Sequence, residues 1–427
     1  MSGPSKGSQQ SGKPSVRFEV CGGEPSENLY RSCRRMIVGP WLNQPEHYEG
    51  YNGFVGWTGI TRLKSGRWLL TFTSGSWHAT VPWTEDIRND PACRRQFEEW
   101  KKIGLPNIWA PRGGRAHIMH SDDEGRSWSK PETLIDTEYD DRHPTILELN
   151  DGTLLCTFFT YALPGQAASW YMRSTDGGEN WSELEALPGE SFGGFGNGSA
   201  IQLSDGTVLC SVGGKVKEDG EHQSLNICRS RDSGKSFEVA SVIEGVSGLS
   251  ESPIAELPDG RIVLISRRSG PIYWSEDGGD SWSEPQTFGV EIYDPHFVVV
   301  PSGVLACFHG SYNGRGLRVI LSADGGLRWR GPKEAVGYAV DPSVYGYSHA
   351  MVLPDGTVYV VYLHTGGHRP HDARTEAIWG LRVKVNEGAD GIEILPAPGS
   401  PAETGGVVHD PGASDFSGGD PELGNRV

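Results

Sequence analysis

Short apolar runs rich in Val, Ile and Leu alternate along the chain with turn sequences, and no long stretch shows the periodicity of an amphipathic helix. The segment 250–282 is a complete example. It has an apolar run at Pro253–Ala255, a turn at Pro258-Asp259-Gly260, a second run at Ile262–Ile265 and a hairpin at 275–282. Pro fixes φ, Asp bonds its own backbone and Gly adopts a positive φ, so the triplet predicts a tight turn between two strands.

The hairpin that ends this segment recurs with the pattern Ser-x-Asp-x-Gly-x-x-Trp. Its five copies start about 45 to 56 residues apart, the length of a four-stranded propeller blade. The copies are SDDEGRSW (121–128), STDGGENW (174–181), SRDSGKSF (230–237), SEDGGDSW (275–282) and SADGGLRW (322–329). Asp and Ser can bond the turn backbone and the aromatic residue can pack against the blade, so we interpret this Asp-box motif as structural.

A second turn motif, out of phase with the first, gives the number of blades. A glycine preceded by Asp or Ser lies between two apolar runs six times, at Gly66, Gly152, Gly206, Gly260, Gly303 and Gly356. These turns predict an all-β fold, a six-bladed β-propeller with Asp-box hairpins, over residues 16–397. We expect the first blade at about 36–128 and the last at about 343–396, closed by a strand from near the N-terminus.

The first blade carries a long insertion at about 77–112. Within it, the segment Pro91–Lys102 predicts a short helix. Because long insertions in propellers map to loops, we expect the insertion to form a lid or rim on the binding face.

Composition limits the partners. The net charge of −17 argues against nucleic acid or an anionic membrane as partner, and an anionic substrate would need local arginines. The N-terminus lacks the apolar core of a signal peptide, and no apolar run is long enough for a membrane helix, so a soluble protein is expected. Compartment and oligomeric state stay open. Residues 1–15 and 398–427 have the composition of disordered tails.

The seven cysteines show no Cys-x-x-Cys spacing, so neither a disulfide framework nor a zinc site is expected. Cys156, Cys210 and Cys307 each lie four residues after a turn glycine, which favours small buried side chains in equivalent places. Because no His-x-His spacing occurs either, we expect neither a metal nor a cofactor.

The residue nine positions before each turn glycine falls at one depth of the innermost strand in every blade. None of the six is aliphatic: they are Trp57, His143, Asn197, Glu251, Asp294 and Tyr347. Innermost strands border the central axis of a propeller, so these side chains predict a binding funnel. The position before each adds Arg142 and Tyr293.

The hairpins, the turns and two segments near the funnel resemble the sialidase (neuraminidase) superfamily, the BNR-type six-bladed propellers, over roughly residues 36–396. Glu251 begins Glu-x-x-x-x-Glu-Leu-x-Asp-Gly-Arg, and Arg267 ends the return strand. A Glu and an Arg occupy these two places in the family. Tyr347-Ser348, followed by Leu353-Pro354-Asp355-Gly356, resembles the segment that carries the family's nucleophilic tyrosine.

The resemblance implies a retaining exo-glycosidase that removes a terminal acidic sugar, sialic acid or a related 2-keto acid, from a glycan. Tyr347 is then the nucleophile, and Glu251 accepts its proton. A neutral tyrosine suits this substrate because the carboxylate on the anomeric carbon repels an anionic nucleophile. Arg267 and Arg315, with Arg318 as the alternative to Arg315, would hold that carboxylate by paired charge-assisted bonds.

Two positions depart from the family pattern. Where the family has Arg-Ile-Pro in its first blade, this chain has Gly56-Trp57-Thr58. Arg142-His143-Pro144 stands at the same offset one blade later, so Arg142 is a candidate to bind substrate together with His143, Trp57 and Asn197. The acid/base aspartate has no recognisable context. Glu85 and Asp86 match it by order along the chain, and Asp141 and Asp294 are the competing candidates.

Histidines are also numerous near the inner-strand ends, at His143, His296, His309, His349 and His364. Together with the missing first arginine they keep one alternative open, hydrolysis or β-elimination of a neutral or uronate sugar on the same scaffold. A second alternative is a propeller that binds glycans without catalysis, because the Asp box also occurs in non-catalytic propellers.

Overall fold

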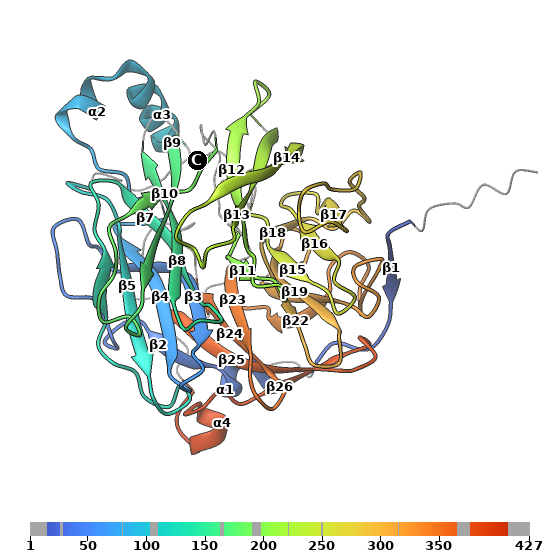
Figure 1. Ribbon diagram of the computed structural model, residues 1–427. Coiled ribbons are helices and arrows are strands. Elements are labelled where there is room, and N and C mark those ends of the chain that lie inside the picture. Colours follow the sequence, from blue (N-terminus) through green and yellow to red (C-terminus); the bar gives the residue numbers. More distant parts are fainter. Residues whose placement is uncertain are drawn as a thin grey trace, which may run out of the picture.

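The computed structural model describes residues 15–25, 29–78, 80–102, 110–162, 166–189, 198–220, 222–248, 251–314, 316–364 and 376–408. Their strands form six separate sheets. In four of the sheets the strands follow chain order from the innermost strand outward, and in the other two an N-terminal strand, β1 or β2, is added on the outside. The sheets stand around a common axis (Figure 1). The predicted six-bladed β-propeller is therefore confirmed.

The first three blades are four-stranded antiparallel sheets. Blade 1 comprises β3 (Phe54–Arg62), β4 (Trp68–Gly75), β5 (Arg115–Ser121) and β6 (Glu132–Ile135). Blade 2 comprises β7 (Asp140–Glu148), β8 (Leu154–Ala162), β9 (Gln166–Ser174) and β10 (Glu185–Ala186). Blade 3 comprises β11 (Ile201–Gln202), β12 (Val208–Val216), β13 (His222–Ser230) and β14 (Glu238–Ser247).

The other three blades vary in their outer strands. Within the described residues blade 4 has β15 (Ile254–Glu256), β16 (Ile262–Ile265) and β17 (Ile272–Ser275). Blade 5 has β18 (Ile292–Val299), β19 (Leu305–Ser311), β20 (Leu317–Ser322), β21 (Arg328–Gly331) and β22 (Tyr338–Asp341). Blade 6 has β23 (Gly346–Val352), β24 (Val358–Leu363), β25 (Ile378–Val385) and β26 (Ile392–Leu395).

The N-terminal part of the chain closes the ring. β2 (Arg35–Val38) pairs antiparallel with β25, which confirms the predicted closing strand. Arg34, just before β2, forms a fully buried ion pair of 2.8 Å with Asp341 at the end of β22. The Tyr362 hydroxyl donates to the same carboxylate at 2.9 Å. An addition that the sequence did not predict is β1 (Arg17–Val20), which pairs in parallel with β21.

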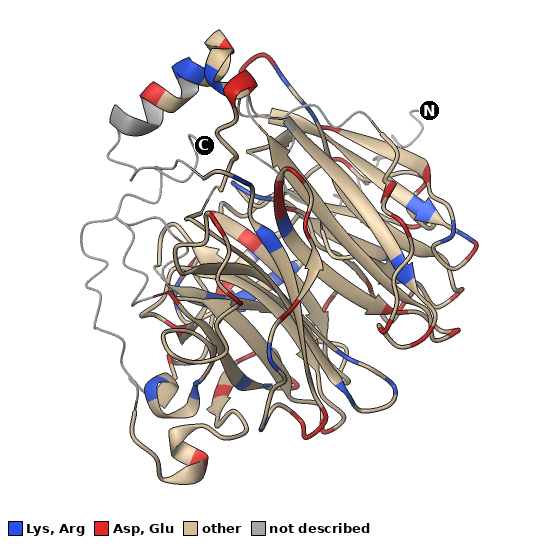
Figure 2. Ribbon diagram, turned by 90° about the vertical axis from the view of Figure 1, so that its left-hand side faces the viewer, with Lys and Arg blue, Asp and Glu red and all other residues tan. Residues whose placement is uncertain are grey.

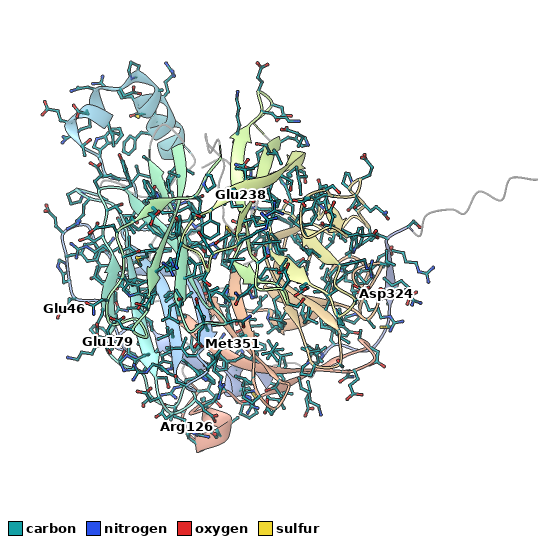
Figure 3. All side chains as sticks on the ribbon, viewed as in Figure 1. Glu46, Arg126, Glu179, Glu238, Asp324 and Met351 are labelled. Atoms are coloured by element: carbon teal, nitrogen blue, oxygen red, sulfur yellow. The ribbon has the colours of Figure 1, made fainter. Side chains whose placement is uncertain are left out.

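The Asp-box hairpins share one set of hydrogen bonds. In each, the aspartate accepts from the backbone N–H four residues later at 2.8–3.0 Å, and the serine hydroxyl accepts from the box glycine's N–H at 2.8–2.9 Å. All five box glycines have positive φ. The hairpins lie at the rim of the molecule. Glu179 and Asp324, from two of them, are at opposite edges of Figure 3, whereas Met351 of β23 lies toward the middle.

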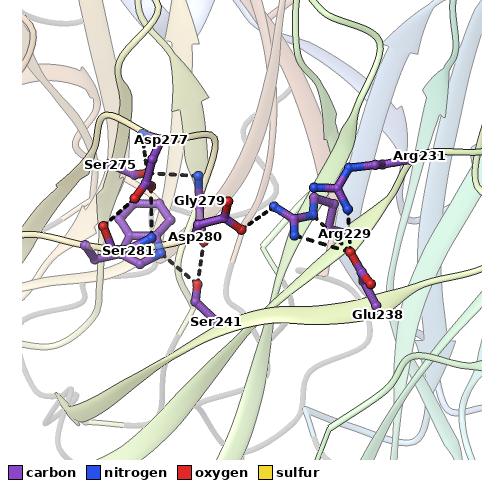
Figure 4. Close-up of polar contacts among 10 residues, drawn as sticks. Arg229, Arg231, Glu238, Ser241, Ser275, Asp277, Gly279, Asp280 and Ser281 are labelled. Atoms are coloured by element: carbon purple, nitrogen blue, oxygen red, sulfur yellow. Dashed lines mark hydrogen bonds and ion pairs between the residues drawn. The ribbon is translucent and has the colours of Figure 1, made fainter.

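The box of blade 4 also ties that blade to blade 3 (Figure 4). Asp280 pairs with Arg229 of β13 at 2.6 Å. The Trp282 indole donates to the Ser241 hydroxyl of β14 at 3.1 Å, and that hydroxyl donates in turn to the Gly279 carbonyl. The hairpin therefore both folds its own turn and fastens neighbouring blades together.

The insertion in blade 1 folds as two helices, α2 (Glu85–Asn89) and α3 (Pro91–Lys102), and the predicted helix is confirmed with its bounds. Asp90 caps α3, since its carboxylate accepts from the N–H groups of Ala92 and Cys93 at 2.8 Å. Trp83 stacks on Phe97 of α3 at 4.4 Å, so the insertion has a small core of its own. Both helices carry acidic and basic residues (Figure 2) and stand at the opposite end of the molecule from α1 (Leu29–Cys33) and α4 (Pro401–Thr404) (Figure 1).

The folded part of the chain extends past residue 397, where the composition placed the start of a disordered tail. α4 follows there, its C-cap Gly405 adopts φ 69°, and Glu403 pairs with Arg126 at 2.8 Å. Ser400 is fully buried, so this Ser/Pro-rich segment packs against the rest of the fold. Residues 1–14 and 409–427, the rest of the two expected tails, lie outside the described residues.

Cys156, Cys210 and Cys307 are fully buried, as predicted, and all seven cysteines are free thiols. None of the helices in the described ranges combines the length and the apolar character needed to cross a membrane.

We expect Asp277→Ala to lower the free energy of unfolding by about 1 kcal/mol, the cost of losing a comparable capping side chain. Hydrogen bonds from the Ser281 hydroxyl and amide lower the pKa of Asp277 from 3.8 to about 2. Because the folded pKa lies below the unfolded one, this stabilisation is complete above pH 4 and is lost as the pH falls toward 2.

Chemical denaturation at several pH values tests this expectation. The difference between wild type and Asp277→Ala should shrink below pH 4. Glu276→Ala, at the exposed neighbouring position, is the matched control and should change stability little. A pH-independent difference between wild type and Asp277→Ala would contradict the role of the carboxylate.

Candidate active site

Five of the six predicted axial positions are described, and four of them have an unusual backbone. Trp57, His143, Asp294 and Tyr347 have φ values of 55°, 55°, 44° and 51°, in the left-handed region that non-glycine residues rarely adopt. Each coincides with a register shift between the innermost strand and the next, at Gly56/Gly59, Arg142/Thr145, Tyr293/His296 and Gly346/Ser348. Such bulges re-aim a side chain and concentrate near functional sites.

The fifth position, Glu251, lies just before β15 and is 9% exposed. Its Oε1 accepts from Arg267 Nη1 at 2.8 Å. Arg267 lies beyond the end of β16, and its Nη2 also donates to the Tyr312 hydroxyl at 2.9 Å. Burial raises the pKa of Glu251, and the Arg267 charge opposes this rise. Glu251 and Arg267, both predicted to face the funnel, therefore form a buried charge pair, a contact that the sequence did not predict.

Tyr347 is 2% exposed and packs among aromatic rings. Trp57 meets it edge-on at 4.6 Å between centroids, and Tyr293 and Tyr345 lie at 5.5 and 5.6 Å. Burial raises the pKa of Tyr347 well above its usual value, and the negative charge of Glu251 raises it further. Phenol and carboxylate thus belong to one site, in which the phenol stays neutral.

Asp294 lies between the two groups just described. Its backbone N–H donates to Glu251 Oε2 at 2.6 Å, and its Oδ2 accepts from the Ser348 N–H at 2.9 Å. His143 Nε2 is 3.6 Å from its Oδ1. Burial and the Glu251 charge raise the pKa of Asp294 well above its usual range. Below, the axial site means Trp57, Arg142, His143, Glu251, Arg267, Asp294 and Tyr347.

Arg142 faces the axial site but has its own counter-charge. Its Nε donates to Asp140 at 2.6 Å, and its Nη2 donates to the His78 carbonyl at 2.8 Å. Its guanidinium lies 5.4 Å from the centre of the Trp57 ring. The Arg142 charge also lowers the pKa of Glu251, although less than Arg267 does. Arg142 therefore contributes positive charge beside Trp57, largely balanced by Asp140.

Asp141 points to the opposite side of β7 from Arg142, because neighbouring residues on a strand alternate in direction. Its carboxylate accepts from the Thr137 N–H at 2.8 Å and from the Thr137 hydroxyl at 2.6 Å. Burial raises its pKa to about 7. These contacts make Asp141 a brace for the segment before β7.

The remaining predicted residues divide into two groups. Asn197 and Arg315 lie outside the described residues. Arg318, the alternative to Arg315, is held by Glu24 at 2.9 Å and by the Gly314 carbonyl at 2.7 Å, on the outer side of blade 5. Glu85 and Asp86 are acidic residues of the first turn of α2 in the insertion.

Sequence reasoning missed Asp140, His78 and Tyr312. His78 packs against Trp57 at 4.6 Å and Tyr312 bonds Arg267, although neither lies on an innermost strand. Both follow the second strand of their blade, as Arg267 does. Antiparallel second strands end beside the start of the first, but His78, Arg267 and Tyr312 stand at different distances from their turn glycines, so no single offset in the sequence identifies them.

Two of the histidines, His296 and His349, lie next to a cavity on the propeller axis. His296 and His349 lie ring to ring at 3.9 Å, and His349 Nε2 is 2.9 Å from the Ser199 hydroxyl. They border an axial cavity of about 180 Å³ to which all six innermost segments contribute. Burial lowers the pKa values of His143 and His296 to about 4, so these rings are neutral at physiological pH. Among the described residues, no three His, Cys, Asp or Glu side chains are grouped to hold a metal ion.

Comparison with known proteins places the chain in a family. The model of the BNR repeat-like domain matches residues 112–360, more than half of the chain. A curated sialidase from Micromonospora viridifaciens is 30% identical over 218 residues, which are 44% of this chain. The match covers 32% of that sialidase, so the chain spans about a third of its length.

Solved structures share the fold at low identity. A Dyadobacter fermentans protein of unknown function has a TM-score of 0.59 at 17% identity, covering 85% of this chain and 99% of that one. The Hadza microbial sialidase Hz136 has a TM-score of 0.53 at 16% identity, covering 77% and 65%. The Penicillium chrysogenum α-L-arabinanase complexed with arabinobiose has a TM-score of 0.52 at 16% identity, covering 82% and 97%. The chain belongs to the BNR repeat-like domain family and has the six-bladed propeller fold found in sialidases.

Proposed function

We propose that the protein is a retaining glycoside hydrolase in which Tyr347 is the nucleophile and Glu251 its base. The observation that carries this proposal is geometric. Arg267 binds Glu251 Oε1, and Asp294 bonds both Glu251 Oε2 and the N–H that directly follows Tyr347, so the three buried side chains are held together. Membership of the BNR family and the fold shared with sialidases and an arabinanase support glycoside chemistry.

The environment of Tyr347 fits a nucleophile that is activated only during reaction. Its raised pKa keeps the phenol neutral in the resting site, so it does not repel an approaching anionic sugar. As the phenol oxygen bonds to the anomeric carbon, the phenol proton passes to Glu251. The bond from that carbon to the aglycone oxygen breaks, and the aglycone oxygen takes up a proton from water. Burial raises the pKa of Glu251, which makes it a stronger base for this transfer. Water then hydrolyses the glycosyl–tyrosine and restores the configuration of the substrate.

The substrate that we propose first is a terminal acidic sugar, sialic acid or a related 2-keto acid, on a glycan. Arg267 is the described arginine best placed to hold its carboxylate, since it already binds one carboxylate in the site. Arg142, beside Trp57, adds positive charge from the neighbouring blade.

A neutral or uronate sugar is the second candidate. Two observations favour the neutral sugar: Asp140 balances Arg142 at 2.6 Å, and Trp57 occupies the place of the first arginine in the sialidase pattern. A Trp ring stacks on sugar faces without needing a charge on the substrate. A propeller that only binds glycans is the third reading, and loss of turnover on replacing Glu251 separates it from the other two.

We expect Tyr347→Phe to lower kcat by at least about a thousandfold, because the nucleophilic oxygen is removed while the ring packing remains. Glu251→Gln should lower kcat by about 10²- to 10⁴-fold. Release of aryl aglycone from a sialoside, an arabinofuranoside and a uronide measures both effects. Tyr359→Phe is the matched control, since its buried hydroxyl lies in blade 6 away from the site and makes no hydrogen bond in the described structure. Full activity of Tyr347→Phe would exclude the proposed nucleophile.

Product analysis of the same panel decides the substrate class. We expect NMR of the first-formed sugar to show retained configuration, as a covalent intermediate requires. Activity on 2-keto-acid glycosides would support the acidic substrate, and activity confined to arabinosides or uronides would support the second candidate. An unsaturated product, seen by its ultraviolet absorbance, would identify elimination and contradict hydrolysis.

Asp141→Asn should leave turnover within about twofold of wild type, because its carboxylate braces Thr137 and not the axial site. Its stability effect should depend on pH. The folded pKa of about 7 lies above the unfolded 3.8, so wild type loses stability as the pH rises from 4 to 7 and the asparagine variant does not. Thermal unfolding at pH 4, 6 and 8 measures this difference. A large loss of kcat without loss of stability would instead make Asp141 the acid/base residue.

A further inference from the structure

Asp294 contacts three other blades through its own atoms. From the bulge near the start of β18 in blade 5, it bonds Glu251 before blade 4 and Ser348 of blade 6, and it approaches His143 of blade 2. It is 3% exposed, with a φ of 44°. A residue held in a strained conformation by contacts on three sides marks a position that the surrounding structure fixes.

Each of the two hydrogen bonds fixes one half of the proposed catalytic pair. The Asp294 N–H binds Glu251 Oε2 while Arg267 binds Oε1, so both oxygens of the base are held. The Asp294 carboxylate binds the N–H of Ser348, the group that follows Tyr347 in the chain. Because Tyr347 itself has a φ of 51°, this bond helps to hold the backbone that aims the phenol.

We propose that Asp294 is a positioning residue that sets the geometry of Tyr347 relative to Glu251, and that it is not the acid/base group. This inference rests on the proposed function of that pair. The Asp294 carboxylate is directed at the Ser348 N–H and the His143 ring. Asp294 is only 3% exposed, so its carboxylate is not open to a leaving group. A general acid needs a path to the glycosidic oxygen, whereas a positioning residue needs only its hydrogen bonds.

Asparagine separates the two roles. In Asp294→Asn the amide oxygen still accepts from the Ser348 N–H, and the unchanged backbone N–H still binds Glu251, but no carboxyl proton can be transferred. We expect kcat for Asp294→Asn to fall by less than about tenfold. Asp294→Ala keeps only the backbone contact and should lose about 10²-fold in kcat with KM little changed, the effect of displacing a reacting group by about 1 Å.

The leaving group supplies the second readout. Two glycosides of the same sugar, one with a 4-nitrophenyl and one with an alkyl aglycone, are compared for wild type and both variants. A positioning defect lowers kcat equally on both, and azide does not restore activity. If Asp294 were the acid/base group, both variants would lose far more on the alkyl glycoside and azide would rescue the aryl substrate. Either result would overturn the proposal.

Hydrogen exchange of the Ser348 amide tests the hydrogen bond between Asp294 and Ser348 without requiring turnover. Exchange should be faster in Asp294→Ala than in wild type and close to wild type in Asp294→Asn. Should Asp294→Ala fail to fold, Asp294→Ser serves in its place. Unchanged exchange in the alanine or serine variant would overturn the positioning role of Asp294. If exchange is faster in the variant but the wild type hydrolyses no glycoside, the positioning role is upheld and the proposed function is refuted.

Discussion

Burial of the Glu251 carboxylate is the constraint on which the organisation of the axial site depends. A carboxylate with 9% exposure is costly unless charge and hydrogen bonds replace its water. Arg267 supplies the charge on one oxygen, and the Asp294 N–H supplies a hydrogen bond to the other. Arg267 is drawn from the end of β16 and Asp294 from the start of β18, so satisfying one buried group ties two blades together at the axis.

The bulges explain how so many side chains can reach one point. In a regular strand neighbouring residues point to opposite faces, toward the adjacent blades and not toward the axis. A residue with positive φ at the bulge breaks this alternation once in each of blades 1, 2, 5 and 6. The backbone strain is tolerated because the ladder resumes within two residues, and because the aromatic packing of Trp57 and Tyr347 holds the bulged strands.

Much of this was readable from the sequence, since the spacing between a turn glycine and the bulge is constant. That spacing located Trp57, His143, Glu251, Asp294 and Tyr347, and the hairpin repeats gave the blades. The constant spacing does not predict which of two neighbouring side chains beside a bulge points to the axis. Asp141 and Arg142 are neighbours on one strand, yet one braces Thr137 and the other faces the axis. Tertiary packing that no local pattern encodes determines two further features. One is the set of contacts made just after the second strands, such as the bond between Arg267 and Tyr312, and the other is the parallel pairing of β1.

In the mechanism proposed above, the charges of the axial site connect substrate binding with activation of Glu251 as the base. Arg142 is balanced by Asp140 and Arg267 by Glu251, so a substrate carboxylate bound at Arg267 competes with the base for the same guanidinium. The Arg267 charge lowers the pKa of Glu251. A ligand that takes up part of this charge therefore raises the pKa of Glu251 and strengthens it as the acceptor of the Tyr347 proton. A neutral sugar leaves the ion pair intact and the base weaker. In the proposed mechanism, the pairing of Glu251 with Arg267 thus makes the strength of the base depend on the charge of the bound sugar.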